Sequence, residues 1–347
     1  MSRRTPLDLN RRDVLKATGT AGLVGLAGCT DGGNGDGNGG GNGGGNGDAT
    51  DEGTEDGGNG GQGQRISWHA GGQSGTYYPL SNEFKGVVEA NTPHTLQVQS
   101  TGASVENVGS LANGDADFAL IQNDIAYFAA NGEGLEAFQG NPVESLRGVA
   151  TLYPETIHIV TRPDAGIESL SDMEGASINT GDLGSGTQVN ALQILETVGI
   201  TPQDFDEQNA DFGTAADQLR DGDVDAAFVV GGWPVGAVAD LAETSDIEIL
   251  NLDDETRSQL RDAASWFADD TIPAGTYSGI DEDVATVSVQ AMIATRAEYD
   301  ADVVEEVTAA IFDNVDELTI KTDFISADTA QDGMSIDLHE GAARYFG

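Results

Sequence analysis

The sequence predicts an α/β protein of two lobes joined by a hinge of two crossing strands. Short apolar runs bounded by turn residues alternate with longer stretches of helical periodicity, as in mainly parallel sheets covered by helices. The same layout occurs twice along the chain, each time with a glycine-rich loop, a Gly-Asp turn and a buried strand. About 283 residues, 65–347, follow a polar N-terminal segment, and this length suits two lobes of ordinary size.

The first 64 residues are predicted to export and tether the protein. The pair Arg11-Arg12 precedes an apolar run of about a dozen residues, which is shorter than the ~20 needed to cross a bilayer. Leu-Ala-Gly before Cys29 is similar to the lipidation site of exported lipoproteins. We therefore expect residues 1–29 to be a twin-arginine export and lipoprotein signal with Cys29 as the lipid anchor, while an uncleaved N-terminal anchor stays open. Residues 30–64, nearly all Gly, Asn, Asp, Glu, Thr and Gln, are expected to form a disordered tether.

The composition is strongly acidic and poor in lysine. The whole chain has a net charge of −44, and after residue 29 the 57 acidic and ten basic side chains leave −47. Lys85 and Lys321 are the only lysines of that part. This composition is typical of proteins from extreme halophiles, in which multimolar salt screens the self-repulsion. Nucleic acid is not expected as a partner, because almost no basic surface exists to displace counterions from phosphates. Cys29 is the only cysteine, so disulfides within the chain are excluded.

The expected elements follow in chain order. Apolar runs predict strands at Arg65–Ala70, Thr95–Val98, Phe118–Ile121, His158–Val160, Ala176–Ile178, Ala226–Val230 and Ile247–Leu250. Helical periodicity predicts a helix running through Val88 and others over Thr187–Val198, Asp302–Asn314 and near Leu338–Tyr345. The chain is expected to cross between lobes at about 157–162 and to return along Val287–Arg296. Lobe 1 would then hold residues 65–160 and 285–347, and lobe 2 residues 161–284.

Two glycine loops occupy corresponding places in the two halves. GGQSGT and GDLGSGT each follow a short predicted strand and open a predicted helix. The distance along the chain from the glycine loop to the aspartate after the Gly-Asp turn is similar in the two halves. It is 42 residues from Gly75 to Asp117 and 39 residues from Gly186 to Asp225. In open α/β sheets ligands lie beyond the carboxyl ends of the strands, so the two loops are expected to face each other across a cleft. The alternative is that βα units share such turns generically.

The loops lack the residues that nucleotide or hydrolytic chemistry needs. No Lys follows either loop, so neither is a P-loop, and neither matches G-x-G-x-x-G. No serine of the loops lies in G-x-S-x-G, and the four histidines show no spacing for a serine base or a metal. We therefore expect no catalytic residues, no metal and no cofactor. Uncharged N–H groups and hydroxyls at helix starts can instead hold a carboxylate, although each Ser or Thr could equally cap its own helix.

The expected ligand contacts come from the loops, a third helix start and the end of a buried strand. The loops and the helix start at Ser104 offer donors, while Gln122 and Asp124 could fix polar parts of the ligand, an amino group suiting Asp124. Aromatic side chains offer apolar walls, although each alone could belong to the core. The candidates are Gly72, Ser74, Gly75, Thr76, Tyr77, Ser104, Gln122, Asp124, Tyr153, Ser185, Gly186, Thr187, Trp233 and Tyr277.

Five blocks of the sequence, in this order, resemble the TAXI family, the solute-binding components of tripartite ATP-independent periplasmic (TRAP) transporters. The blocks are GGQSGTYYPLSNEF, STGASVENVGSLANGDADFALIQND, IHIVTRPDAGIESLSDMEG, GDLGSGTQVNALQILETVGI and GDVDAAFVVGGWPVGAVADLA. The resemblance covers about residues 65–347. It implies a type II periplasmic-binding-protein fold that closes on a ligand and delivers it to membrane permease subunits. It also implies that Gly232, Trp233 and Pro234 belong to the binding residues.

The function that the resemblance implies is transport and not catalysis. The known ligands of family members are mostly glutamate, glutamine and other small carboxylates, so a small carboxylate or amino-acid ligand is expected. Trp233 stands where related sequences often have Tyr, which leaves the size of the ligand open. The expected location is the extracellular face of the cell membrane, with a lipid anchor at Cys29. The alternatives are a binding lipoprotein of an ATP-driven importer, which shares the fold, and a secreted hydrolase that acts through Ser74 or Ser185.

Overall fold

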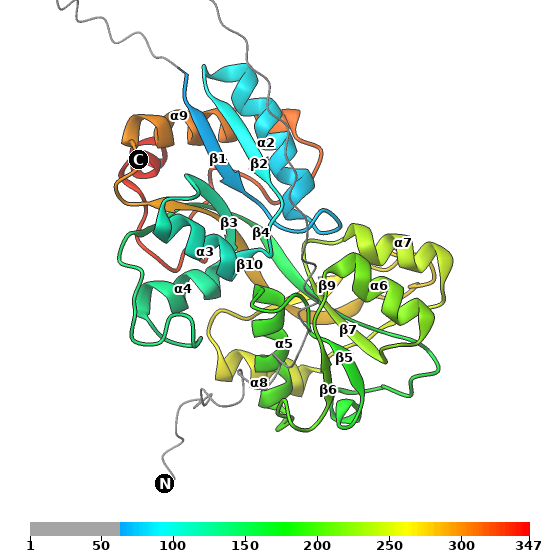
Figure 1. Cartoon of the computed structure of the whole chain (residues 1–347). Coiled ribbons are helices and arrows are strands. Elements are labelled where there is room, and N and C mark those ends of the chain that lie inside the picture. Colours follow the sequence, from blue (N-terminus) through cyan, green and yellow to red (C-terminus); the bar gives the residue numbers. More distant parts are fainter. Residues whose placement is uncertain (1–62) are drawn as a thin grey trace, which may run out of the picture. The chain divides into compact units, whose positions relative to one another are not determined.

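Residues 63–347 are described by the structure, a computed structural model (Figure 1). The predicted export signal, Cys29 and residues 30–62 of the predicted tether lie outside the described residues. The strands are β1 (Arg65–His69), β2 (Thr95–Gln99), β3 (Phe118–Gln122), β4 (Leu146–Thr161), β5 (Ser177–Asn179), β6 (Asp206–Gln208), β7 (Ala226–Val230), β8 (Glu248–Ile249), β9 (Ala268–Ile272) and β10 (Val284–Arg296).

Helices alternate with the strands along the chain. They are α2 (Tyr77–Asn91), α3 (Ser104–Asn113), α4 (Asn123–Asn131), α5 (Gly186–Thr197), α6 (Phe212–Asp221), α7 (Gly236–Thr244), α8 (Asp254–Ala263), α9 (Ala301–Phe312) and α10 (Glu340–Phe346), with the short 3-10 helices η1 (Leu170–Met173) and η2 (Val315–Glu317). The predicted strand Ala226–Val230 is β7, whereas the predicted strand His158–Val160 is the end of the much longer β4. Of the predicted strand Ile247–Leu250, only the two residues of β8 are paired.

The strand order is β2-β1-β3-β10-β4-β7-β5-β6. In lobe 1, β1 is parallel to β2 and β3, and β10 is antiparallel to β3. In lobe 2, β5 is parallel to β6 and β7, and β4 is antiparallel to β7. The two lobes thus repeat one plan, in which three parallel strands are followed by an antiparallel strand that arrives from the other lobe.

Two long strands connect the lobes, as Figure 1 shows at its centre. Strand β4 pairs with β10 up to Thr156 and with β7 from Ile157 onward. Strand β10 pairs with β9 over its first residues and with β3 over its last. The predicted two-lobed α/β fold with two crossing strands is therefore confirmed. The exact lobe boundaries, at 160/161 and 284/285, remain predictions.

Each lobe has its own apolar core. In lobe 1, Trp68 of β1 is fully buried and packs against Phe118 of β3 and Phe84 of α2, with ring centroids 5.4 and 5.9 Å away. In lobe 2, Phe228 of β7 and Ile194 of α5 are fully buried in one cluster. Burying a side chain of this size stabilises the folded state by about 1.5–3 kcal/mol. These contacts fix the helices against the sheets and so fix where each helix begins.

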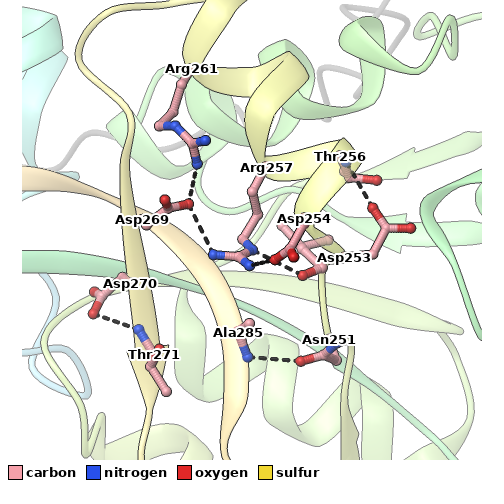
Figure 2. Close-up of polar contacts among 11 residues, drawn as sticks. Asn251, Asp253, Asp254, Thr256, Arg257, Arg261, Asp269, Asp270, Thr271 and Ala285 are labelled. Atoms are coloured by element: carbon pink, nitrogen blue, oxygen red, sulfur yellow. Dashed lines mark hydrogen bonds and ion pairs between the residues drawn. The ribbon is translucent and has the colours of Figure 1, made fainter.

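A cluster of ion pairs links α8 to β9 at the edge of lobe 2 (Figure 2). Arg257 pairs with Asp254 of its own helix and, at 3.0 Å, with Asp269 of β9, which also pairs with Arg261. Asn251, just before α8, accepts a hydrogen bond from the backbone N–H of Ala285 at 2.8 Å. Acidic side chains thus gather around the few arginines of this edge. Within residues 63–347, every helix is too short or too polar to cross a membrane.

Candidate functional site

A narrow cavity lies between the two lobes, at the carboxyl ends of their parallel strands. Its walls are the segments that follow β1, β2, β5 and β6, together with the ends of β3 and β7 and one residue of β4. The cavity volume is about 50 Å³, compared with about 30 Å³ for one water molecule in the liquid. The lobes are therefore close together here, and only a small group fits between them without opening. In α/β sheets this is the edge where ligands bind.

Most of the residues expected from the two glycine loops line this cavity. Both loops contribute, one from each lobe, together with the helix start at Ser104 and the strand end at Gln122. The expected residues that line it are Gly72, Ser74, Gly75, Thr76, Tyr77, Ser104, Gln122, Ser185, Gly186 and Thr187. The two loops thus face each other across one space, as the repeated layout predicts.

Four helices begin at the cavity. The first residues of α2, α3, α5 and α6 are Tyr77, Ser104, Gly186 and Phe212, and all four line the wall. In α6 the side chain of Asp211 accepts from the first free N–H groups. The first N–H groups of a helix have no partner within it, and the helix dipole places partial positive charge at the same end. The site therefore offers uncharged donors from both lobes, an arrangement that suits an anionic oxygen.

The hydroxyl groups at these helix starts have different partners. Ser185 caps α5, because its Oγ accepts a hydrogen bond from the N–H of Gln188 at 3.1 Å. Ser104 does not cap α3; its Oγ accepts from the N–H of Gln122 at 3.1 Å. Thr76 makes no cap hydrogen bond either, and its Oγ1 donates across the lobes to the carbonyl of Gly232 at 3.3 Å. Capping thus accounts for Ser185, whereas Thr76 helps to hold the lobes together.

A buried polar relay connects the lobes beside the cavity. Gln122 Nε2 donates to Asn190 Oδ1 at 3.1 Å, and Asn190 Nδ2 donates to Asp124 Oδ2 at 2.7 Å. Asn190 lies on α5 of lobe 2, whereas Gln122 and Asp124 belong to β3 and α4 of lobe 1. Asp124 does not itself line the cavity. Burial raises the pKa of Asp124 to about 6.

Besides Asp124, five expected residues lie outside the cavity wall: Tyr153, Gly232, Trp233, Pro234 and Tyr277. The hydroxyl of Tyr277 accepts from the N–H of Val235 at 2.9 Å and lies 2.9 Å from His158 Nε2. Burial lowers the pKa of His158 to about 4. Nδ1 of this ring donates to the carbonyls of Thr156 and Val229, so Nε2 accepts a hydrogen bond from the Tyr277 hydroxyl. Tyr277 therefore supports the Trp233–Pro234 turn from the core of lobe 2, and its expected role as an apolar wall stays a prediction.

Glu155 and Lys321 were not expected from the sequence. Glu155 of β4 lines the cavity with a side chain only 3% exposed, and burial raises its pKa to about 8. Lys321 donates to the carbonyl of Trp233, and its Nζ lies 5.3 Å from the Trp233 ring centroid and 5.9 Å from that of Tyr153. Burial lowers the pKa of Lys321 to about 8.

Features of the sequence could have pointed to both Glu155 and Lys321. Glu155 is the lone charged residue in the apolar run LYPETIHIV, and a charge inside a buried strand is rare unless it has a partner. Lys321 is one of two lysines after residue 29. In a chain so depleted of lysine, a half-buried one indicates a specific contact. Among residues 63–347, no three His, Cys, Asp or Glu side chains are arranged to hold a metal ion.

The strand order and the interlobe cavity define the class: a two-lobed α/β protein with the type II periplasmic-binding-protein fold. A family model described as the NMT1-like family matches residues 69–347, and the chain belongs to this family.

The similar solved structures are distant in sequence. A protein from Bordetella bronchiseptica RB50 is 14% identical, with a TM-score of 0.50; the match covers 81% of this chain and 82% of that one. A ligand-binding component of an ABC-type import system from Staphylococcus aureus, with zinc bound, is 12% identical, with a TM-score of 0.47. The match covers 81% of this chain and 84% of that one. A putative L-cystine ABC transporter from Listeria monocytogenes is 13% identical, with a TM-score of 0.44; the match covers 77% of this chain and 98% of that one. The likeness to the Bordetella protein supports the fold.

Proposed function

We propose that this chain is the extracellular solute-binding subunit of a TRAP-type transporter of the TAXI family. It would capture a small carboxylate, such as glutamate, glutamine or a dicarboxylate, by closure of the lobes and deliver it to the membrane permease. The observation that carries the proposal is the convergence of helix N-termini on one interlobe cavity, those of α2, α3 and α5 being the ones without a capping carboxylate. Their unbonded N–H groups and dipoles favour an anion. Because both lobes supply donors, a ligand bound there would hold the lobes closed.

The N-terminal segment completes the proposal. A lipid on Cys29 would hold the folded lobes at the extracellular face of the membrane through the Gly- and Asn-rich tether. The acidic composition then corresponds to a halophilic environment, in which the salt screens the repulsion between carboxylates.

Ligand binding tests the proposal directly. Amino acids and small mono- and dicarboxylates are screened by thermal unfolding in multimolar KCl, and each stabilising compound is then titrated by calorimetry. A true ligand at 100 times its dissociation constant adds about 2.7 kcal/mol to the free energy of unfolding, which raises the unfolding midpoint measurably. Failure of every amino acid and carboxylate to shift the midpoint would contradict the proposal.

The same geometry fits a binding lipoprotein of an ATP-driven importer, because the fold and the cavity do not depend on the energy source. The two functions separate in proteoliposomes that contain the cognate permease. Uptake driven by an ion gradient without ATP supports a TRAP-type system, whereas uptake that requires ATP inside the vesicle supports the importer.

A further inference from the structure

An open groove lies at the end of lobe 2 that is far from the interlobe cavity. Its volume is about 640 Å³, within the range of about 300–1,000 Å³ that is usual for ligand sites. Thr161, which lines the groove, pairs with Ala226, the first residue of β7. Val230, the last residue of β7, lines the interlobe cavity instead. The two spaces thus lie at opposite ends of one sheet, and no residue lines both.

The groove follows one edge of strand β8. Five consecutive residues, 247–251, form one side of it, and six consecutive residues, 279–284, form the other. Side chains of consecutive strand residues point to opposite faces of a sheet, so a groove lined by all of them runs along the backbone edge. The two sides meet where the N–H of Leu252 donates to the carbonyl of Ala285 at 2.8 Å, and where Asn251 accepts from the N–H of Ala285 (Figure 2).

The backbone of Ile249 is directed into this groove. Strand β8 pairs with β4 and with no other strand of residues 63–347. Ile249 lies opposite Val160, and the N–H of the next residue, Leu250, donates to the carbonyl of Ile159 at 2.9 Å. In an antiparallel ladder this pattern marks a pair whose two residues do not bond each other, so the N–H and C=O of Ile249 point away from β4. Thr161, which is 1% exposed, also lines the groove, and its Oγ1 has no hydrogen-bond partner among the described residues.

The groove is more acidic than the chain as a whole. Five of its fourteen lining residues are Asp or Glu, against 59 of 347 in the full sequence, and none is Lys or Arg. A neighbouring groove of about 350 Å³ contains two arginines beside two aspartates, so the imbalance is not a general property of grooves in this lobe. Within residues 63–347, four of the acidic side chains form no ion pair with Lys or Arg: Glu168, Glu248, Asp281 and Glu282.

We propose that this groove binds an extended segment of a partner protein, which adds as a strand to β8 and carries alternating cationic and apolar side chains. The inference goes beyond the proposed function, because this partner is not transported and does not enter the interlobe cavity.

The alternation of β8 itself specifies that pattern. Ile247 and Ile249 point to one face, where they belong to one apolar cluster with Ile280 and Val284. Glu248 points to the other face and is exposed. Side chains of an added strand alternate in the same way, so its apolar residues would pack beside the isoleucines and its Lys or Arg residues beside Glu248. Main-chain hydrogen bonds to the edge would supply affinity, and these side-chain pairs would supply specificity.

Charge favours such a partner over a second copy of this chain. Two copies paired edge to edge through β8 would each bring Glu248, Asp281 and Glu282 to the same place. Like charges directly opposite each other destabilise a sheet, whereas a cation opposite Glu248 stabilises it. An acidic edge thus prevents self-association of the sheet and still accepts a basic strand.

A synthetic heptapeptide tests the inference on the full chain. The peptide KVKVKVK, acetylated and amidated at its ends, is compared with EVEVEVE and with lysinamide. Calorimetry is done in about 1 M KCl, where charges more than about 3 Å apart are screened, so that general attraction to an acidic protein is suppressed. We expect KVKVKVK to bind at least about tenfold tighter than either control. Equal affinity for EVEVEVE, or for lysinamide, overturns the inference.

Backbone methylation separates strand addition from attraction between charges. Only alternate amides of an added strand face β8. Methylating one set of alternate amides in KVKVKVK should therefore weaken binding by at least about tenfold, whereas methylating the other set should preserve it. The sets cannot exchange roles by a shift of one residue, because that shift turns every valine to the acidic face. Equal effects of the two sets would show that the peptide does not bind as a strand.

A triple variant places the peptide in the groove. Glu248→Gln with Asp281→Asn and Glu282→Gln removes three exposed charges of the groove and should weaken binding of KVKVKVK by at least about tenfold. The matched control replaces three exposed carboxylates of α7 and α8: Asp240→Asn, Glu243→Gln and Asp262→Asn. Both variants lose the same net charge, so equal weakening in the two would contradict the inference.

Hydrogen exchange gives the position without any variant. Amides of residues 247–251 should exchange more slowly when KVKVKVK is bound to the parent chain, because the N–H of Ile249 would then be hydrogen-bonded. Unchanged exchange in this segment at saturating peptide overturns the inference, even if the triple variant fails to fold. None of these measurements uses a ligand of the interlobe cavity, so their failure would leave the proposed function as it stands.

Discussion

At the scale of single residues, Gly186 shows how little room the closed lobes leave. It opens α5 of lobe 2, and an added Cβ would lie 1.7 Å from Gln122 Oε1 and 3.1 Å from Ser104 Oγ of lobe 1. Gln122 cannot simply turn away, because its amide also donates to Asn190. A side chain at position 186 must therefore push the lobes apart or break the relay.

We expect Gly186→Ala to weaken ligand binding by about tenfold, since overfilling a packed site typically costs about 1–3 kcal/mol. The unfolding midpoint of the ligand-free protein should stay close to that of the parent, because the lobes can open. Calorimetry with the tightest-binding amino acid or carboxylate and thermal unfolding measure the two quantities separately. The loss should shrink in a Gln122→Ala background, where the obstructing atom is gone.

Gly109→Ala is the matched control for this change. Gly109 lies inside α3, and an added Cβ there meets nothing within 4 Å. This change should leave affinity unaltered and stabilise the fold slightly, by about 0.4–1 kcal/mol, because alanine restricts the unfolded chain. Equal affinities of Gly186→Ala and Gly109→Ala would show that the lobes do not close at position 186.

At the scale of elements, the two lobes use the same device to join a helix end to a strand start. Helices α3 and α6 end at Gly114 and Gly222, whose φ angles of +78° and +79° lie in the left-handed region that glycine adopts easily. Three residues later, Asp117 accepts from the N–H of Ser67 at 2.8 Å. The equivalent Asp225 accepts from the N–H of Ser177 at 2.9 Å. The repeated Gly-Asp turns of the sequence are thus one structural motif used twice.

An arginine from each crossing strand completes this motif. Arg296, at the end of β10, lies 3.0 Å from Asp117, and Arg162, just after β4, lies 3.2 Å from Asp225. We expect Asp117→Ala and Asp225→Ala to lower the free energy of unfolding by about 1–2 kcal/mol each, since each leaves a backbone N–H unpaired. The Asp117 change should cost more, because Asp117 is 19% exposed and Asp225 36%.

Urea unfolding in constant KCl measures these losses. The controls are Asp115→Ala and Asp223→Ala, two residues earlier in each turn, whose exposed side chains should be dispensable. Losses as large in the controls would mean that the effect does not come from the hydrogen bonds of Asp117 and Asp225.

The sequence predicts those site residues whose place in the fold is determined by the residues next to them in the chain. Gly75 and Gly186 lie at the cavity because a glycine loop after a parallel strand always reaches the same edge of the sheet. The place of Tyr277 could not be predicted, since a single aromatic side chain in the sequence fits a buried core and a cavity wall equally well. Glu155 was missed because its place depends on where β4 crosses between lobes. The contact of Lys321 with Trp233 joins segments 88 residues apart, which no local pattern reveals.

At the scale of the whole described chain, the closed arrangement depends on several contacts between lobes. Besides the polar relay at Asn190, Phe128 of α4 packs edge-on against Trp266 at 4.8 Å between ring centroids. Trp233 meets Phe324 in the same way at 5.9 Å. The lobes are thus held together by aromatic contacts as well as by hydrogen bonds. Opening of the lobes must expose these aromatic side chains to water. We therefore expect the equilibrium between the closed and open states to depend on the salt concentration.

Salt acts on this protein in two opposing ways. It screens the attractive ion pairs, such as those of Arg257 and Arg261 (Figure 2), and it screens the repulsion among the carboxylates. Exposed ion pairs contribute at most about 1 kcal/mol each. With 57 acidic and ten basic side chains after residue 29, repulsive pairs far outnumber attractive ones, so the net effect of screening must be stabilising. The Debye length falls from about 10 Å at 0.1 M to about 3 Å at 1 M, which removes most of the repulsion.

We therefore expect the thermal unfolding midpoint to rise steeply between 0.1 and about 1 M KCl and more slowly above it. Circular dichroism at 222 nm, a wavelength used generally for helices, follows the transition. A variant in which Asp281, Glu298 and Asp328 are each replaced by lysine should unfold at a higher temperature than the parent in low salt and lose that advantage in high salt. These three carboxylates are exposed, so the gain must come from reduced repulsion. A midpoint that falls with added KCl, or a variant no more stable than the parent in low salt, would show that the acidic surface does not limit the stability of this fold.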